Sequence, residues 1–279
     1  MTNQSDAIRL FGEMVSRREE EIELAKAALL FAKEEYPDLD IDVYLRKLDL
    51  MAEEIKSRVG HNTSPYFLIT EINNYLFKEE GFRGNEDDYY DPKNSFLNDM
   101  LDRKTGIPIT LSLLYMEIAN RLGLTLLGVG FPGHFIVKYS GIEGEILVDP
   151  FNKGRILSNK DCKEILDRIY GGRMQFHSEF LQPVTKKEIL SRMLHNLKGI
   201  YLNSTNYLKA LSIVDMILLI DPEAMDELRD RGLLYYNLEC FTQALSDIET
   251  YLRRTTNAQD AELIRGYIPV LKGLTAKIS

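Results

Sequence analysis

The sequence predicts an α+β protein with a helical N-terminal part, a central core built around a small antiparallel sheet, and an all-α C-terminal part. Three observations indicate this order. Apolar residues recur at three-to-four spacing before residue 81, strand-like apolar runs fill 124–148, and a 34-residue repeat follows. We expect four segments along the chain: a flexible segment 1–18, a domain 19–155, a connecting helix and loop 156–185, and a helical domain 186–279.

Length and composition narrow the class of protein. With 279 residues, 44% of them hydrophobic, the chain is long enough for one large or two modest cores. Its net charge of -9 argues against general binding of nucleic acid or anionic membranes, because both require a basic face. Residues 1–18 lack the apolar core of a signal peptide, and no run approaches the roughly 20 apolar residues of a membrane helix. We expect a cytoplasmic protein with no membrane segment.

Cysteine and histidine usage indicates neither a disulfide framework nor a metal site. Only Cys162 and Cys240 occur, far apart in the sequence, which favours a reducing compartment. The histidines His61, His177 and His195 show no ligand spacing. We therefore expect no metal and no cofactor, and a structural role for Cys162.

Three helices are predicted before residue 81, over 19–36, 40–59 and 64–80. Asp40 is a candidate cap for the second helix. Ser64 caps the third and Pro65 occupies its first turn, while Gly81 ends it. The charged faces of these helices are read as solvated surface, so we expect no chemistry in this part of the chain.

The stretch from Gly106 to Tyr115 lies at the centre of the predicted fold. A nearly all-apolar helix over 108–122 follows the glycine, and such a helix is buried. Its first turn offers unpaired N–H groups and a positive dipole end, where cysteine enzymes lower a thiol pKa and stabilise an oxyanion. His134 and Asp149 follow. Helix start, histidine and aspartate in this order are typical of a papain-like or transglutaminase-like cysteine site, but this helix start carries no cysteine.

The pattern after residue 123 predicts strands over 124–131, 135–139 and 145–148, with a hairpin turn at 141–144. His134 stands at the entry of the second strand, and Asp149 ends its antiparallel neighbour. We expect these two ends at opposite edges of a simple hairpin unless the register is offset, so the sequence leaves their contact open.

Several motifs follow one another in a characteristic order: Gly81 to Asn85, Tyr89 to Pro92, Asn94-Ser95, Gly106 to Ser112, Pro132 to Phe135 and Asp149 to Phe151. Together they resemble the bacterial SirB family of transglutaminase-like proteins, over nearly the whole chain from about Leu24. The resemblance implies a transglutaminase-like (papain-like) core followed by tetratricopeptide-like helices. It matches His134 and Asp149 to the enzyme histidine and aspartate, and makes Asn85, Asn94 and Ser95 candidate binding residues. Independently of the resemblance, the residue types predict a short helix over 96–101 that Asn94 or Ser95 caps.

One position departs from the active enzymes of that superfamily. The nucleophilic cysteine of such enzymes stands two residues after a glycine, and here Pro108 occupies that place after Gly106. Proline has neither a nucleophile nor an N–H. The hydroxyls of Thr110 and Ser112 lie two and four positions further on, and bonding to the preceding helical turn is the alternative interpretation of both.

The C-terminal third contains an internal repeat. After a helix over 160–170 and a Thr185 capping box, Ala210-Leu211-Ser212 returns as Ala244-Leu245-Ser246 at an offset of 34, and Tyr201 pairs with Tyr235. This period and pattern predict two tetratricopeptide units, with residues 258–274 as a terminal cap. Such helices bind a protein or peptide partner, here with Tyr201 and Tyr235 as candidates, or they brace the central domain.

Two hypotheses of function follow. In the first, the chain is a pseudoenzyme, a non-catalytic transglutaminase-like protein that acts as a protein-binding or regulatory module, with His134 and Asp149 as a vestigial pair. In the second, it is a hydrolase or acyltransferase of altered chemistry, in which Thr110 or Ser112 attacks with His134 as base and Asp149 orienting it. A lone structural histidine is the simplest interpretation of His134 without the resemblance.

Overall fold

The computed structural model describes residues 6–142, 144–255 and 259–278. The chain forms two compact units, Met1–Met193 and Leu194–Ser279. The division falls inside one helix, α8 (Lys186–Asn203). Each unit has its own apolar core.

The first unit begins with a group of helices. They are α1 (Asp6–Val15), α2 (Leu24–Glu35), α3 (Ile41–Val59) and α4 (Pro65–Asn73), and α4 continues as a π-helix over 74–79. Asp40 caps α3 by accepting hydrogen bonds from the N–H groups of Asp42 and Val43, as predicted. Ser64 makes no side-chain cap bond, although Pro65 is the first residue of α4 as expected.

Helix α1 lies within the segment 1–18 that was expected to be flexible. Phe11 and Val15 on one face of α1 are almost completely buried, and α1 packs against α2. The expectation fails for residues 6–15 because their apolar side chains recur at helical spacing and find a partner helix. Residues 1–5 of that segment lie outside the described part of the chain.

Two small sheets position the centre of the first unit. Strands β1 (Arg83–Gly84) and β2 (Thr105–Gly106) pair in parallel. Strands β3 (Leu127–Val129), β4 (Ile136–Gly141), β5 (Gly144–Asp149) and β6 (Arg155–Leu157) form an antiparallel sheet in that order. Three of these four strands were predicted, and Glu143 in the predicted turn is not described. Strand β6 brings the start of the expected 156–185 linker into the sheet.

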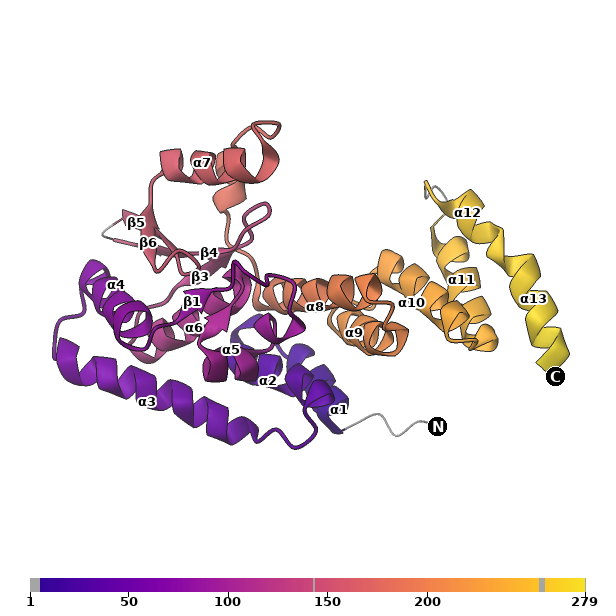
Figure 1. Ribbon diagram of the computed structural model, residues 1–279, viewed down its shortest axis with the longest axis horizontal. Helices are drawn as coiled ribbons and strands as arrows, with labels where there is room; N and C mark the ends of the chain where they lie inside the picture. Colours follow the sequence, from indigo (N-terminus) through magenta and orange to yellow (C-terminus); the bar gives the residue numbers. More distant parts are fainter. Residues whose placement is uncertain (1–5, 143, 256–258, 279) are drawn as a thin grey trace. The chain divides into compact units, whose positions relative to one another are not determined.

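Helices cover both faces of the antiparallel sheet (Figure 1). Helix α6 (Pro108–Arg121) packs on β3 and β4, and α5 (Leu97–Arg103) packs beside α6. On the other face, α7 (Asn159–Tyr170) buries Cys162 and Leu166 against Ile136, Leu147 and Leu157. The central helix is therefore enclosed, as its apolar sequence predicted.

The second unit is all helical. It contains the end of α8 and then the helices α9 (Tyr207–Ile220), α10 (Met225–Asn237), α11 (Phe241–Arg254), α12 (Ala261–Arg265) and α13 (Tyr267–Ile278). The repeated alanines Ala210 and Ala244 are fully buried. A Cβ on Gly232 of α10 would lie 2.9 Å from Ile248 of α11, so the small residue lets the two helices approach. Helices α12 and α13 occupy the place of the predicted cap; its Ala258 lies outside the described residues.

Candidate functional site

His134 and Asp149 lie side by side at one edge of the antiparallel sheet. Val137 of β4 pairs with Val148 of β5, so the entry of β4 lies next to the end of β5. His134 Nε2 lies 2.9 Å from Asp149 Oδ2. The sequence-based expectation of opposite edges was wrong, because in an antiparallel hairpin the first residue of one strand neighbours the last residue of the other.

A tight turn presents the histidine. The N–H of His134 donates to the carbonyl of Phe131 at 3.0 Å, and Gly133 has a φ of 66°. Proline followed by a glycine of positive φ suits a type II turn, and Pro132-Gly133 supplies both residues. The turn fixes the backbone of His134, which is 7% exposed.

The turn after β5 holds Asp149 in place. Asn152 donates its backbone N–H to Asp149 Oδ1 at 3.2 Å and its side-chain amide to Oδ2 at 2.7 Å. Burial raises the pKa of the Asp149 carboxyl, but the hydrogen bonds from His134 and Asn152 outweigh it and hold the pKa below its usual range. Asn73 closes the turn from outside: its amide donates to the Gly154 carbonyl at 2.8 Å, and its oxygen accepts from the Tyr115 hydroxyl at 2.9 Å.

Aromatic rings border the imidazole. The ring centroid of Phe151 lies 5.9 Å from that of His134 in an edge-to-face arrangement, and Tyr89 stands 6.4 Å from Phe151. A Cβ on Gly84 would lie 2.5 Å from the Phe151 ring, so only glycine at this position leaves room for that ring. The side chain of Tyr89 is part of the surface at 39% exposure. The histidine therefore lies beneath an aromatic rim.

The start of α6 carries no nucleophile. Pro108 is its first helical residue, and both Pro108 and Ile109 are buried. A Cβ on Gly106 would lie 2.7 Å from the Thr110 hydroxyl, so the glycine allows the β2 backbone to contact the first turn of the helix. The position that resembles the enzyme cysteine is thus filled by a ring without an N–H.

Both candidate hydroxyls are fully buried and bind backbone carbonyls. Thr110 Oγ1 lies 2.8 Å from the Asn94 carbonyl and 3.1 Å from that of Ile107, and it accepts the Ile107 N–H at 3.1 Å. Ser112 Oγ lies 3.5 Å from the carbonyl of Phe135. Among the described residues, neither hydroxyl is hydrogen bonded to the imidazole of His134.

The candidate residues of the preceding loop are part of its internal scaffold. Asn85 donates to Asn94 Oδ1 at 3.0 Å, and the Asn94 amide donates to the carbonyls of Asp88 and Tyr89. Asn94 and Ser95 are buried, and the Ser95 hydroxyl has no partner in the described structure. Neither residue caps α5, whose N-cap position is Phe96, so that prediction was wrong. The bond to the Tyr89 carbonyl holds the backbone of a residue whose ring belongs to the aromatic rim.

Arg192 is a neighbour of the site that the sequence did not reveal. Its Nη2 donates to the carbonyls of Phe131 at 3.2 Å and His134 at 2.6 Å, and the guanidinium carbon lies 5.4 Å from the Phe135 ring centroid. Arg192 follows these residues by about 60 positions and lies on α8, so no local motif connects them. It holds the turn that presents the histidine.

Cys162 is not placed for nucleophilic chemistry. It lies in the core between α7 and the sheet, fully buried. Burial raises the pKa of its thiol to about 11, so the thiol stays protonated at neutral pH. This position agrees with the predicted structural role.

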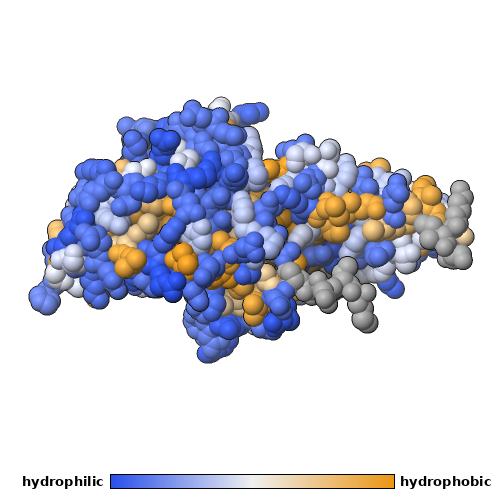
Figure 2. Space-filling view, turned by 60° about the horizontal axis from the view of Figure 1, so that its bottom comes forward, coloured by the Kyte–Doolittle hydropathy of each residue, from blue (hydrophilic) through white to orange (hydrophobic). Residues whose placement is uncertain are grey.

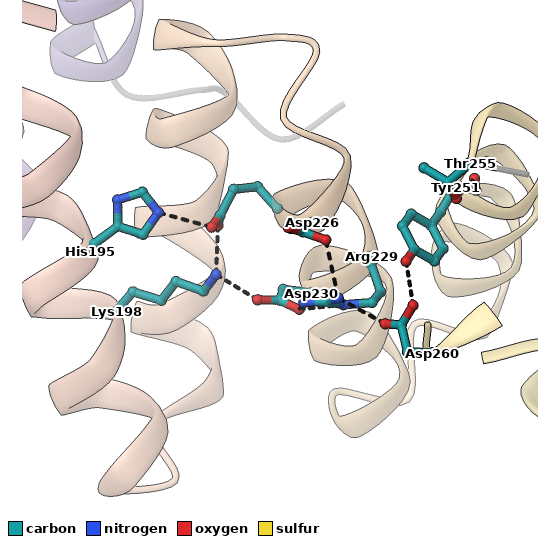
Figure 3. Close-up of polar contacts among 9 residues, drawn as sticks. His195, Lys198, Asp226, Arg229, Asp230, Tyr251, Thr255 and Asp260 are labelled. Carbon is teal, nitrogen blue, oxygen red and sulfur yellow. Dashed lines mark hydrogen bonds and ion pairs between the residues drawn. The ribbon is translucent and has the colours of Figure 1, made fainter. Parts of the chain in front are cut away.

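The second unit contains a chain of ion pairs across α8, α10 and α11 (Figure 3). Lys198 Nζ lies 2.7 Å from Glu227 Oε2 and 2.6 Å from Asp230 Oδ2, and His195 Nε2 lies 3.0 Å from Glu227 Oε1. Arg229 continues the chain to Asp230 and Asp260, and Asp260 accepts from the Tyr251 hydroxyl. Burial raises the pKa of Glu227, but His195 and Lys198 outweigh it and lower the pKa overall.

The two tyrosines predicted as binding residues pack beneath cations. Tyr201 is 5% exposed, with Lys209 Nζ 5.4 Å from its ring centroid. Tyr235 is partly buried, with the Arg231 guanidinium 6.0 Å from its ring. Larger apolar exposure lies elsewhere in this unit, at Leu208 and Leu263. Figure 2 shows hydrophobic residues gathered over the C-terminal helices on the face that it presents.

Two searches of the described ranges complete the inventory of sites. They contain no group of three or more histidine, cysteine, aspartate or glutamate side chains arranged to hold a metal. None of the helices in the same ranges combines the length and the apolar character needed to cross a bilayer. A separate hollow of about 790 Å³ in the first unit is lined by α2, α6 and the start of α8, and its charged lining residues include the ion-paired Asp49, Glu117 and Arg121.

Family comparisons agree with this architecture. Residues 42–195 match the family model described as transglutaminase-like superfamily, and residues 197–269 match a tetratricopeptide repeat model. The chain is 36% identical to a UPF0162 protein of Xylella fastidiosa over 93% of each chain. It is 28% identical to protein SirB1 of Salmonella typhimurium over 80% of this chain and 81% of that protein.

A third relative matches a smaller share of the chain. F-box only protein 21 of Homo sapiens is 31% identical over 61% of this chain, which is 28% of its own length. The bacterial matches, by contrast, run through both units. The chain therefore belongs to the transglutaminase-like superfamily, within the bacterial group that includes SirB1 and the UPF0162 proteins, and it carries tetratricopeptide repeats after the transglutaminase-like domain.

Proposed function

We propose that this protein is a non-catalytic transglutaminase-like protein that acts as a protein-binding or regulatory module. The observation that carries the proposal is Pro108 at the first position of α6, opposite a retained histidine–aspartate pair. A cysteine enzyme of this fold needs a thiolate at that helix start, and proline provides none. The His134–Asp149 pair then supports the neighbouring rings of Phe151 and Tyr89 and transfers no proton.

The state of the neighbouring hydroxyls supports the same conclusion. Thr110 and Ser112 are fully buried, and each lies in hydrogen-bond range of a carbonyl oxygen. A hydroxyl nucleophile requires a general base within hydrogen-bond reach, and both hydroxyls bind main chain instead. The altered-chemistry alternative would require α6 to rearrange.

A direct assay tests the absence of catalysis. Purified full-length protein is incubated with an ester, an amide and a glutamine peptide plus a primary amine, beside the His134→Ala variant. We expect no turnover above that of the variant with any of the three. Turnover by wild type that His134→Ala abolishes would refute the proposal. If Thr110→Val or Ser112→Ala, each as a separate single variant, also abolished that turnover, the hydroxyl concerned would be the nucleophile of the alternative.

The binding function is assigned to the tetratricopeptide helices. Their exposed leucines, Leu208 and Leu263, are each 69% exposed, and tetratricopeptide helix pairs commonly bind peptides. The test compares affinity capture by wild type, Leu208→Ser, Leu263→Ser and the control Leu50→Ser, whose leucine is 63% exposed in the first unit. We expect specific partners to be lost with the first two variants and retained with the control. Identical capture by all four proteins would argue against partner binding through this unit.

A further inference from the structure

Arg192 is a partly buried cation that no carboxylate neutralises among the described residues. Its two hydrogen bonds both leave from Nη2 and end on the carbonyls of Phe131 and His134. Nη1 and Nε donate to no residue in the described ranges, and no ion pair of those ranges includes this guanidinium. Backbone carbonyls orient the group but leave its net charge uncompensated.

This state is electrostatically unfavourable. Burial lowers the pKa of the Arg192 guanidinium, and the hydroxyls of Tyr89 and Tyr170 are the neighbours that oppose the shift. A desolvated charge is stabilised most by an opposite charge that also accepts its hydrogen bonds. Arg192 therefore has donor capacity and charge available for an anion from outside the chain.

The place of Arg192 defines the anion's surroundings. Its guanidinium binds the main chain of the residue whose imidazole contacts Asp149, so the cation belongs to the surroundings of His134. Tyr89 opposes the lowering of the Arg192 pKa, and its ring centroid lies 6.4 Å from that of Phe151. A cation beside an aromatic rim suits a ligand that combines a carboxylate with an aromatic or apolar side chain.

We propose that Arg192, with Tyr89 and Phe151, forms a subsite for the carboxylate of a peptide that binds over His134. The subsite adds a binding position in the transglutaminase-like domain to the one proposed for the tetratricopeptide helices, and it rests on the proposal that this domain binds and does not catalyse. A peptide carboxylate has two sources, the chain end or a glutamate or aspartate side chain, and the chemistry that Arg192 offers is the same for both. The net charge of -9 disfavours anion binding on average, so a preference for a carboxylate peptide would require a local cation such as Arg192.

The chain contains no tryptophan, so the indole fluorescence of a tryptophan-containing peptide reports its binding without a background from the protein. Three tryptophan-containing peptides are titrated, with indole fluorescence anisotropy as the readout: acetyl-Ala-Trp-Ala with a free carboxylate, the same peptide as its amide, and acetyl-Ala-Trp-Glu-Ala amide. We expect wild type to bind at least one carboxylate peptide about tenfold more tightly than the neutral amide, the usual effect of one charge-assisted hydrogen bond. Whichever carboxylate peptide shows the preference identifies the source.

Variants distinguish recognition from a structural effect. Arg192→Gln should abolish the preference for a charged peptide over the neutral amide, and Arg192→Lys, which keeps the charge, should keep part of the preference. The matched control Arg168→Gln removes an exposed guanidinium of α7 and should leave the preference unchanged. Thermal unfolding of each variant verifies that the fold is retained.

Four outcomes would overturn the inference. They are equal affinity of wild type for neutral and charged peptides, no binding of any peptide, equal weakening of all peptides by Arg192→Gln, and displacement of the peptide by inorganic phosphate but not by acetate. Equal binding of neutral and charged peptides would leave the proposed binding function intact. Hydrolysis of a peptide by wild type, lost in His134→Ala, would instead refute the non-catalytic proposal.

Discussion

The His134 site and the helical repeats both bury charged groups, but they compensate them differently. In the second unit Lys198 meets two carboxylates, Glu227 and Asp230, and Arg231 meets two more from neighbouring helices. In the first unit Asp149 is compensated by a histidine and an asparagine, while the partners of Arg192 within the described part of the chain are main-chain carbonyls and an aromatic face. A closed network of opposite charges stabilises a fold, whereas a cation without a counter-charge remains available to a ligand.

Removal of the Lys198 side chain should have the largest effect on the free energy of unfolding. Lys198→Ala leaves Glu227 and Asp230 without their shared cation, and Lys198 and Glu227 are both nearly buried. We expect a loss of about 3 kcal/mol in the free energy of unfolding, measured by urea denaturation of the full chain. The exposed Arg253→Ala in the same unit should change it by no more than about 0.5 kcal/mol. Equal losses would mean that the network contributes no more than a surface charge.

A substitution of Gly106, where the backbone lies close to the start of α6, should have the next largest effect on stability. In Gly106→Ala the new Cβ would lie 2.6 Å from the side chain of Met100 and 2.7 Å from the Thr110 hydroxyl. We expect about 2 kcal/mol of destabilisation, because the first turn of the helix must shift. A matched change, Gly199→Ala in α8, meets no atom within 4 Å and should be neutral or slightly stabilising. A Gly106→Ala protein as stable as wild type would show that the contact relaxes freely.

Asp149→Asn should cost about 2 kcal/mol at neutral pH, since it removes the charge that the His134 and Asn152 hydrogen bonds stabilise. The pKa of Asp149 is lowered in the folded state, so its contribution is complete above the ordinary aspartate pKa and is lost as pH falls through the folded value. The stability difference between wild type and variant should therefore narrow on acidification. A difference that widens as pH falls would contradict the lowered pKa.

Substitutions of the two α6 hydroxyls, Thr110 and Ser112, should have the smallest effects on stability. The two effects should differ in size. Thr110→Val removes short bonds to two carbonyls and to the Ile107 N–H, and should cost about 1 to 2 kcal/mol. Ser112→Ala removes one contact at 3.5 Å and should cost less than about 0.5 kcal/mol. Thermal denaturation of both variants measures this order. The reverse order would mean that Ser112 has a stronger partner than the Phe135 carbonyl.

The sequence predicted the elements whose signal is local. The capped helix at Asp40, the enclosed helix after Gly106 and the Thr185 capping box, in which Glu188 donates its N–H to the threonine hydroxyl at 3.1 Å, are all present. Helix α1 was not predicted, although Phe11 and Val15 stand at helical spacing and are buried on one face of that helix.

The features that depend on distant parts of the chain were harder to predict. The contact between His134 and Asp149 follows from strand register, which residue spacing does not fix. Arg192 contacts a turn about 60 residues earlier, and no sequence pattern predicts such a pair. The tetratricopeptide period, by contrast, is carried by nearest-neighbour packing and is visible at fixed spacing.

The asparagine that closes the Asp149 turn has a consequence for the order of folding. Asn73 joins Tyr115, 42 residues later, to Gly154, 81 residues later. Such contacts require the ends of a long loop to meet, which costs conformational entropy. They therefore contribute little to the earliest steps of folding. The helices on either side form from local contacts, whereas the Asp149 turn reaches its native geometry only once three distant segments have met. Variants of Asn73 should accordingly accelerate unfolding far more than they slow folding.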